Sequence, residues 1–352
     1  TTVTPVVPVT PVAPPTVPAP ALYDATASAY AQLAVANLET SLQHLGTLHE
    51  RRGENQVLHL DYPTKPRAQT WGRIFGHELK LEGKERFGLK SALRGVQIGH
   101  DFMIGETEQG TRHLTGAYLS YSRDKARYHD RFRAENGFIS DDSFTGNANH
   151  KAVSLGVTHT RYTPEGAYLD SVMQYSWINS HAKSRENVQA KQKGKALSLS
   201  VEAGKAYTLR EYEQSALFIE PQAQLTYQHL RLEDGYDVIR HVYGDTHHGL
   251  RGRVGARLLH RGKQTSSEAR PTEWYLNANI VHDFKHPTAV QIGSDTVGEK
   301  HARTWFELGI GAQSALSQNS YWYLDARYEK SFKNSPKRQG VRAQIGYKYT
   351  WQ

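Results

Sequence analysis

Alternation of apolar and polar residues, repeated from segment to segment, most limits what this chain can fold into. In FIEPQAQLTYQHL, which runs from Phe218 to Leu230, every second residue from Ile219 to Tyr227 is apolar, and Glu220 begins the polar set. Successive side chains of a β-strand point to opposite faces. The stretch therefore predicts a strand with one apolar and one polar face.

Twelve such segments follow one another after residue 68, separated by loops rich in Gly, Asn, Asp, Pro and charge. We predict strands at about 69–79, 92–104, 111–122, 148–161, 166–178, 195–208, 216–230, 248–260, 272–284, 301–315, 320–332 and 338–351. We place residues 288–298 in a loop hairpin. The connections near 105–110, 162–165, 209–215 and 316–319 are expected to be short, and those at 123–147, 179–194, 231–247 and 285–300 long. Such alternation is typical of outer-membrane barrels.

An alternating strand fits a soluble sandwich as well as a membrane barrel, because either can give it one apolar and one wet face. The mean hydropathy is −0.65, and we find no apolar run long enough for a membrane-spanning helix. Two features favour the barrel. Glycine and long charged side chains share one face in strand after strand, and aromatic residues gather at strand ends, as in interfacial girdles.

Composition excludes some kinds of site. The chain has no cysteine, which argues against disulfide staples and thiolate sites. Its net charge is +8 and its pI is about 9.4, which we attribute to a solvated surface and a polar lining, not to nucleic-acid binding. We expect no cofactor and no metal, since the histidines of HVYGDTHHG (241–249) lack the spacing of known ligands. The chain starts with threonine, so we expect it to be a piece of a longer protein.

The first 53 residues differ from the rest. Residues 1–20 hold seven of the fourteen prolines and predict an extended linker. Residues 21–53 predict one helix, with Asp24 as its N-cap and Gly53 as its stop, about 45 Å long. Residues 54–352 then form the β domain. Leucines at helical spacing form a stripe on the predicted helix: Leu38, Leu42, Leu45 and Leu48.

A barrel of twelve strands has room for this helix. Its radius is about 12 Å, which leaves a bore about 10 Å wide, close to the width of a helix. Glycines such as Gly255, Gly309 and Gly311 would thin the lining. We therefore predict an all-β fold, a twelve-stranded antiparallel transmembrane barrel with the N-terminal helix inside its pore.

The polar faces of the strands supply the predicted pore lining. These residues are Glu202, Glu220, Gln222, Gln224, Arg251, Arg253, Arg257, Arg303, Glu307 and Arg342. We expect them to face the helix, including its Glu50 and Arg51, across a wet lumen. Arg73 is expected to face inward and brace the helix exit near Glu50, because an arginine at the lipid midplane costs about 2–4 kcal/mol. We expect a bulge or a local break at Pro221.

At this point the sequence resembles a known family. The order of the linker, the helix with LGTLHERRG, and then TWGRIFG, FIEPQAQLTY, LRGRVGARL, WYLNANIVHDF, FELGIGAQSAL and GYKYTW is similar to the C-terminal translocator domain of classical monomeric autotransporters, which act in type V secretion. The resemblance covers residues 21–351. It implies an outer-membrane protein of a Gram-negative bacterium, monomeric and in contact with lipid, that helps to export an N-terminal passenger to the cell surface.

The resemblance also gives the C-terminus a role. Tyr347, Tyr349 and Trp351 share one face, and in the family a terminal aromatic residue on this face is read by the barrel-assembly machinery. A lipid-facing aromatic girdle is the simpler interpretation and is compatible with it. The chain departs from the family pattern by ending in Gln352 after the tryptophan.

We expect no bond chemistry. Some family members cut off their passenger with an Asn-Asn pair in the helix, whereas this helix has only Asn37, with Glu39 and Thr40 at the aligned positions. We find no G-x-S-x-G motif. Two alternatives stay open: a barrel enzyme or channel with the helix as plug or lid, and, more distantly, a soluble β-rich adhesin fragment.

Overall fold

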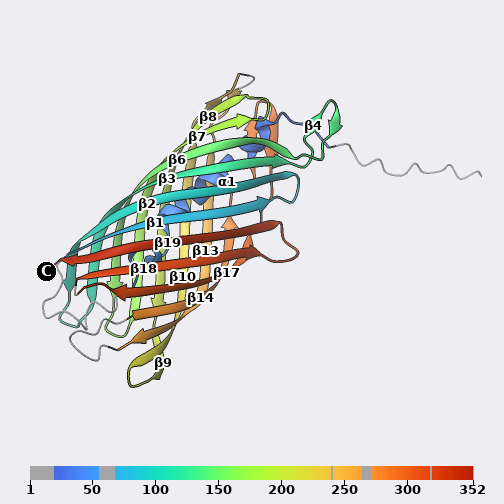
Figure 1. The fold of residues 1–352 in the computed structure, drawn as a ribbon. Coiled ribbons are helices and arrows are strands. Elements are labelled where there is room, and N and C mark those ends of the chain that lie inside the picture. The colour runs from blue at the N-terminus through green and yellow to red at the C-terminus, as the bar shows by residue number, and fades with distance from the viewer. Residues whose placement is uncertain (1–19, 55–67, 239–240, 264–271, 318, 352) are drawn as a thin grey trace, which may run out of the picture.

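The computed structural model describes residues 20–54, 68–238, 241–263, 272–317 and 319–351. In this part of the chain, twelve long strands form one antiparallel sheet that closes on itself (Figure 1). The last strand pairs with the first, from Ala68 opposite Trp351 to Glu82 opposite Lys337. The prediction of a closed twelve-stranded barrel is therefore confirmed, whereas nearly all of the predicted linker lies outside the described residues.

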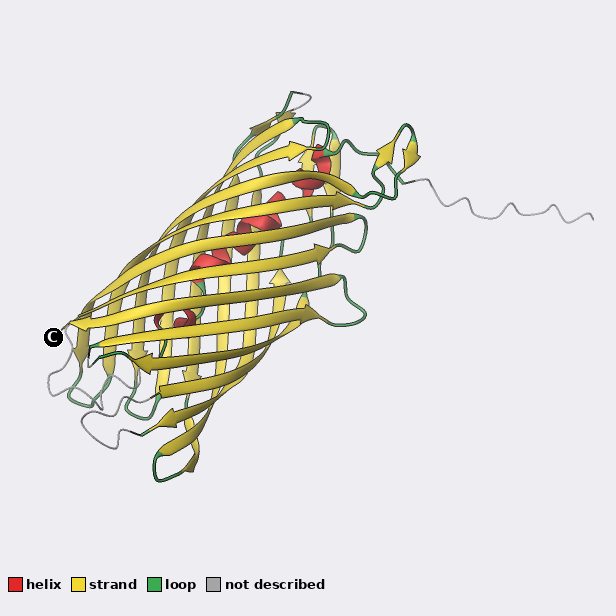
Figure 2. Ribbon diagram, in the orientation of Figure 1, coloured by secondary structure: helices red, strands yellow, loops and turns green. Residues whose placement is uncertain are grey.

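The strands follow one another around the barrel in chain order. They are β1 (Ala68–Glu82), β2 (Phe87–Glu106), β3 (Arg112–Asp130), β6 (Phe144–Tyr162), β7 (Ala167–Ser184), β8 (Gln189–Lys205), β10 (Ser215–Leu232), β13 (Thr246–Gly262), β14 (Thr272–Lys285), β17 (Thr304–Ala315), β18 (Ser320–Ser331) and β19 (Lys337–Trp351). Short strands lie in the connections: β4 (Ala134–Glu135), β5 (Phe138–Ile139), β9 (Tyr207–Glu211), β11 (Gly235–Tyr236), β12 (His241–Val242), β15 (Ala289–Ile292) and β16 (Asp295–Gly298). Two helices, α1 (Thr26–Leu45) and α2 (Leu48–Arg52), lie inside the barrel (Figure 2).

Each predicted strand corresponds to one strand of the barrel, but two of the predicted long loops were wrong or too long. Only four residues, 185–188, connect β7 to β8, so the loop predicted at 179–194 is mostly strand. The loop predicted at 123–147 shrinks to residues 131–143. These strands extend into stretches rich in Lys, Arg and Asn, whose polarity imitates a loop. The hairpin predicted at 288–298 is confirmed as β15 and β16.

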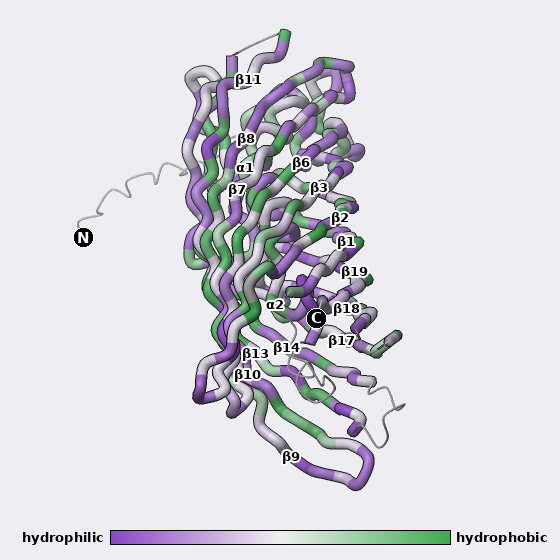
Figure 3. The backbone as a smooth tube through the Cα atoms, turned by 90° about the vertical axis from the view of Figure 1, so that its left-hand side faces the viewer, coloured by the Kyte–Doolittle hydropathy of each residue, from purple (hydrophilic) through white to green (hydrophobic). Residues whose placement is uncertain are grey.

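The two faces of the strands meet different environments, as the alternation predicts. On β10, the side chain of Leu225 is 51% exposed outside the barrel, whereas Glu220 on the opposite face is fully buried. Figure 3 shows hydrophobic and hydrophilic residues alternating along the strands in this way. The aliphatic residues therefore face the surroundings and the polar ones the lumen, opposite to the arrangement in a soluble sandwich.

Lumen glycines make room for aromatic and long side chains of the neighbouring strands. A Cβ atom on Gly311 would lie 2.1 Å from the Tyr275 ring, and one on Gly309 would lie 2.8 Å from Cγ of Arg327. We predicted that these glycines make the pore lining thinner for the helix. Instead, side chains of neighbouring strands occupy the space beside them, and the helix does not come closer. Gly194 differs, because its Cβ would lie 2.7 Å from Nδ2 of Asn37 on α1.

Pro221 coincides with a break in strand pairing, as expected. On one side, β10 pairs with β13 without interruption, and Pro221 lies opposite Ala256. On the other side, pairing with β8 starts only at Gln222, and pairing with β9 ends at Ile219. Pro221 thus lies at the gap between β8 and β9, a place that suits a residue without an N–H.

The predicted single helix is divided in two. Gly46 adopts a φ of +58°, a left-handed conformation that suits glycine, and ends α1. Thr47 then starts α2 with a capping box to Glu50, and Gly53 ends α2 as predicted. Asp24 accepts hydrogen bonds from Thr26 but is not the N-cap, which is Ala25.

In the described part of the chain, neither helix combines the length and the apolar character needed to cross a bilayer.

Candidate functional site

The lumen segment, residues 26–54, fills the barrel and is buried on almost every side. The hydroxyl of Ser41 lies 3.1 Å from those of Ser176 and Ser198, and Gln174 donates to the Ser41 carbonyl at 2.9 Å. Both ring nitrogens of His44 lie 2.6 Å from serine hydroxyls of β3 and β6. Small hydroxyl side chains thus let the wall approach one side of α1 closely.

Glu39 joins α1 to the opposite wall. Its carboxylate accepts from Arg251 at 2.7 Å and from Arg338 at 2.8 Å. Arg251 also pairs with Asp283 at 2.6 Å. Both guanidinium groups lie over the ring of Trp305, at 4.6 and 3.9 Å from its centroid, where cation–π attraction adds to the ion pairs.

Glu50 makes the second connection, one turn into α2. Its carboxylate lies 2.9 Å from Arg342 and 3.7 Å from Arg327. Both arginines also pair with Glu307, at 2.7 and 3.0 Å. The same carboxylate accepts the Thr47 backbone N–H at 2.8 Å. Glu50 therefore caps α2 and ties it to β17, β18 and β19 at once.

Glu54 makes the third connection, just after α2. Arg257 donates to Glu54 at 2.7 Å and to Glu220 at 3.1 Å, and His49 lies 3.1 Å from Glu220. The oxygens and nitrogen of His49, Glu54 and Glu220 are close enough to hold an ion. Arg257 already pairs with both carboxylates, so the cluster fits an internal ion-pair network better than a metal site.

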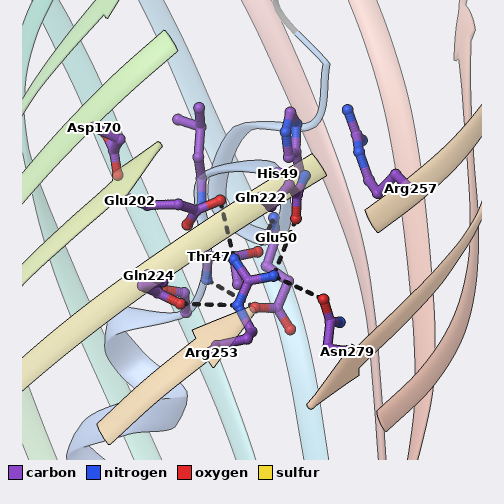
Figure 4. Close-up of polar contacts among 12 residues, drawn as sticks. Thr47, His49, Glu50, Asp170, Glu202, Gln222, Gln224, Arg253, Arg257 and Asn279 are labelled. Atoms are coloured by element: carbon purple, nitrogen blue, oxygen red, sulfur yellow. Dashed lines mark hydrogen bonds and ion pairs between the residues drawn. The ribbon is translucent and has the colours of Figure 1, made fainter. Parts of the chain in front are cut away.

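Arg253 lies beside Glu50 and Thr47, near the start of α2 (Figure 4). It donates to Gln222 at 3.0 Å and to Gln224 at 3.2 Å, and it lies 3.2 Å from Glu202. Glu202 in turn accepts the backbone N–H of Leu48 at 3.0 Å. The arginine thus holds a carboxylate in place at the start of α2, where the helix dipole favours negative charge.

Arg73 of β1 lies against the last turn of α1. It donates to the carbonyls of Gln43 and His44 at 3.0 and 3.1 Å, and to Gln97 and Gln344 at 2.6 Å. A positive charge next to the unpaired carbonyls of a helix C-terminus is favourable. The structure thus places Arg73 where α1 ends, six to seven residues before the expected contact with Glu50.

Arg86 contacts the segment before α1 at the point where that segment enters the barrel. It pairs with both oxygens of Asp130, at 2.8 and 2.6 Å, donates to the Ala21 carbonyl at 2.6 Å, and lies 4.6 Å from the centroid of the Tyr23 ring. Ala27, Tyr30 and Ala31 of α1 belong to one apolar cluster with Val290, Ile292 and Val297 of the β15–β16 hairpin. Arg86 and this apolar cluster therefore hold the start of α1 at the rim.

Little empty space remains in the lumen. A cavity of about 60 Å³ lies between α1, Gln224, Arg253 and Glu307, and a second, of about 30 Å³, lies near Glu39. Such volumes hold a few water molecules. These two spaces beside the lumen segment are therefore far smaller than a bore that could hold a helix.

The other residues predicted for the site lie in three places. Leu38, Leu45 and Leu48 are buried against the wall, and Leu42 is partly buried. Arg51 pairs with Asp170 of β7. The pore-lining prediction is wrong for Arg303, which is exposed at the rim and donates to the carbonyls of Asp283 and Phe284, because β17 begins one residue after it.

The C-terminal aromatic residues face outward beside the closing seam. Tyr347 is 47% and Trp351 50% exposed, and Tyr349 is half-buried. The indole N–H of Trp351 donates to Thr70 of β1 at 2.8 Å, and its ring lies 4.8 Å from that of Tyr349. The three side chains thus mark the junction of the first and last strands.

Several residues of the site were missed from the sequence. They are Glu39, Glu54, Arg86, Arg327 and Arg338, and all five are buried. The sequence did contain a pattern that predicts the lumen position of Arg327 and Arg338. Extending the alternation of Arg342 by four residues puts Arg338 on the lumen face, and the spacing Asp325, Arg327, Glu329 gives a polar face on β18.

Comparison with known proteins identifies the fold's relatives. The Autotransporter beta-domain family matches residues 70–327, more than half of the chain. The chain belongs to this autotransporter family. It is an outer-membrane translocator domain, of a family that is not enzymatic.

Relatives agree with this autotransporter assignment. The chain is 24% identical to the adhesin BmaC autotransporter of Brucella suis biovar 1 (strain 1330) over 88% of its own length and 9% of that protein. It resembles the transport unit of AIDA-I from Escherichia coli with a TM-score of 0.70 and 16% identity, over 92% of this chain and 99% of the other. It resembles the β domain of the Bordetella autotransporter BrkA with a TM-score of 0.63 and 19% identity, over 81% of this chain and 100% of the other. The structural likenesses show the fold.

Replacing Arg73 by alanine is predicted to destabilise this autotransporter barrel by about 3 kcal/mol, because two helix carbonyls and two amide side chains lose a charged donor. The measurement is the unfolding free energy of the detergent-folded chain, followed by tryptophan fluorescence. Arg303→Ala is the matched control and should change it by less than about 0.5 kcal/mol, since that arginine is exposed. Equal effects of the two substitutions would contradict the assigned role of Arg73.

Proposed function

We propose that the lumen segment closes the translocator after export and anchors an N-terminal passenger at the cell surface. The observation that carries this is the triple connection of Glu39, Glu50 and Glu54 to arginines of the wall. The segment starts at the end where Arg86 and the β15–β16 hairpin surround the chain. A passenger attached before residue 20 would therefore stand outside that end.

The chemistry of the lumen supports passage of a polypeptide before closure. Many contacts to the segment are hydrogen bonds and ion pairs with polar side chains of the wall, and before closure these side chains can bond to water instead. The apolar contacts of α1 are small and divided among separate clusters. An extended chain meets no continuous apolar wall, so it slides until the three carboxylates reach their arginines.

We propose further that the last strand serves as the assembly signal. Its support is the exposure of Tyr347 and Trp351 next to the β1–β19 seam, where a barrel closes last. Membrane lipid and the barrel-assembly machinery are the partners that this surface fits. The barrel acts as a monomer, since one chain closes the sheet by itself.

We propose that the chain does not cut its own backbone at Asn37. The side-chain oxygen of Asn37 lies 3.3 Å from the hydroxyl of Ser180. The nearby carboxylate of Glu39 is paired with two arginines and is not available as a base. The intact mass of the stored protein therefore stays constant.

Planar-bilayer conductance tests the closing role. Deleting residues 21–53 is predicted to raise the conductance strongly, because it opens a bore about 10 Å wide. Deleting residues 1–20 instead is the control and should leave the conductance of the full chain unchanged. Equal conductance of the full chain and the helix deletion would show that the segment does not close the pore.

A further inference from the structure

The strands β2, β3, β6, β7 and β8 are neighbours and run to the end of the barrel at which α1 begins (Figure 1). Toward that end, their outward residues change from apolar to basic. One row across the sheet shows the change. Arg94 lies opposite Arg123, which lies opposite Lys151, and the row continues through Asn179 to Lys193. All five side chains are exposed. With strands about 4.8 Å apart, the row is about 19 Å long.

Two more rows of the same kind lie closer to the rim. One contains Lys125 and Lys191, and the other contains Lys90, Arg127 and Lys183. The remaining outward positions of these two rows are Ala, Asn, His and Gln, so the three rows contain no acidic residue. We call this surface, the outward positions of the three rows, the basic face.

The cations of the basic face are poorly neutralised by the protein. Glu78 pairs with Arg94 at 2.8 Å at one border, and Glu233 pairs with Lys195 at 2.6 Å just beyond the other. Within the described residues, no carboxylate lies within 4.0 Å of Arg123, Lys151 or Lys193. Like charges directly opposite each other destabilise a sheet. The arrangement therefore opposes folding and calls for an anion from outside.

The next row, on the side of the basic face away from the rim, is apolar or aromatic on β2, β3, β6 and β7 and ends in Lys195 on β8. Val96 lies opposite Tyr121, which lies opposite Val153, and Trp177 follows on β7. All four are exposed, between 39% and 50%. A ligand that fits both surfaces carries several negative charges directly attached to acyl chains.

We propose that the basic face binds the phosphate groups of lipopolysaccharide, the glycolipid of the outer leaflet, while its acyl chains pack on the apolar row. Arginine and lysine are the usual phosphate-binding side chains, and clustered cations beside a membrane-spanning surface attract anionic lipid. Three rows at two-residue spacing cover about 14 Å along the strands. A surface of that extent fits a glycolipid with more than one phosphate better than a single phospholipid headgroup.

The test compares two triple variants of the full chain with equal loss of charge. Arg123→Gln, Lys151→Gln and Lys193→Gln change the basic face. Arg161→Gln, Arg210→Gln and Lys263→Gln change exposed cations at the opposite end of the barrel. Native mass spectrometry in detergent measures the affinity for purified lipopolysaccharide, for the same glycolipid after removal of its phosphates, and for phosphatidylglycerol. Heat-dependent gel mobility confirms that each variant is folded.

We expect the parent chain and the opposite-end variant to bind lipopolysaccharide equally, and the basic-face variant to bind at least about tenfold more weakly. Removal of the phosphates or high salt should weaken the binding of the parent chain in the same direction. Equal binding by the two triple variants overturns the proposal, as does equal binding of the phosphate-free glycolipid. Equal affinity for phosphatidylglycerol overturns the assignment to a glycolipid. If the basic-face variant does not fold, the salt and phosphate comparisons on the parent chain decide.

Discussion

The ion pairs between the lumen segment and the barrel wall are the interaction on which the rest of the structure depends. Glu39, Glu50 and Glu54 each meet at least one buried arginine. A buried ion pair adds little net stability compared with an apolar contact, but removing one partner costs about 3–5 kcal/mol. The main effect of these ion pairs is therefore to position the lumen segment. Three connections along the segment fix its depth and its rotation in the lumen.

The bilayer explains why the lumen is polar enough for such pairs. Every backbone group of a strand must be paired within the sheet, and a closed barrel has no edge that violates this requirement. The strands turn most of their aliphatic residues outward, so polar residues and glycine make up much of the inside, together with small apolar clusters against the lumen segment. Inward aromatic rings such as Tyr275 then fill the space left by glycines on the next strand. The same alternation thus produces both the membrane surface and the lining that holds α1.

The sequence predicts the strands and their faces because the period of two is a local property. Partners across the lumen are not local: Glu39 and Arg338 meet only because the barrel closes. The division of the helix at Gly46 was also missed, since a single glycine in a helical pattern is tolerated and the Arg73 side chain that lies beside it in the fold is 27 residues further along the chain. The prediction that Arg303 lines the pore was wrong for a related reason. The alternation predicts which face a residue lies on, but not where the strand begins or ends.

Cross-linking of the lumen segment to the wall tests the central claim most directly. The chain has no cysteine, so Asn37→Cys with Gly194→Cys supplies its only two thiols. A Cβ atom on Gly194 would lie 2.7 Å from Nδ2 of Asn37, so the side chains at these two positions meet, as a disulfide between them requires. The account predicts that mild oxidation of the membrane-embedded protein joins the two, and that Asn37→Cys with Lys195→Cys, whose side chain points outward, stays reduced. Free thiols in the first pair, or equal cross-linking in both, would contradict a helix held in the lumen at this depth.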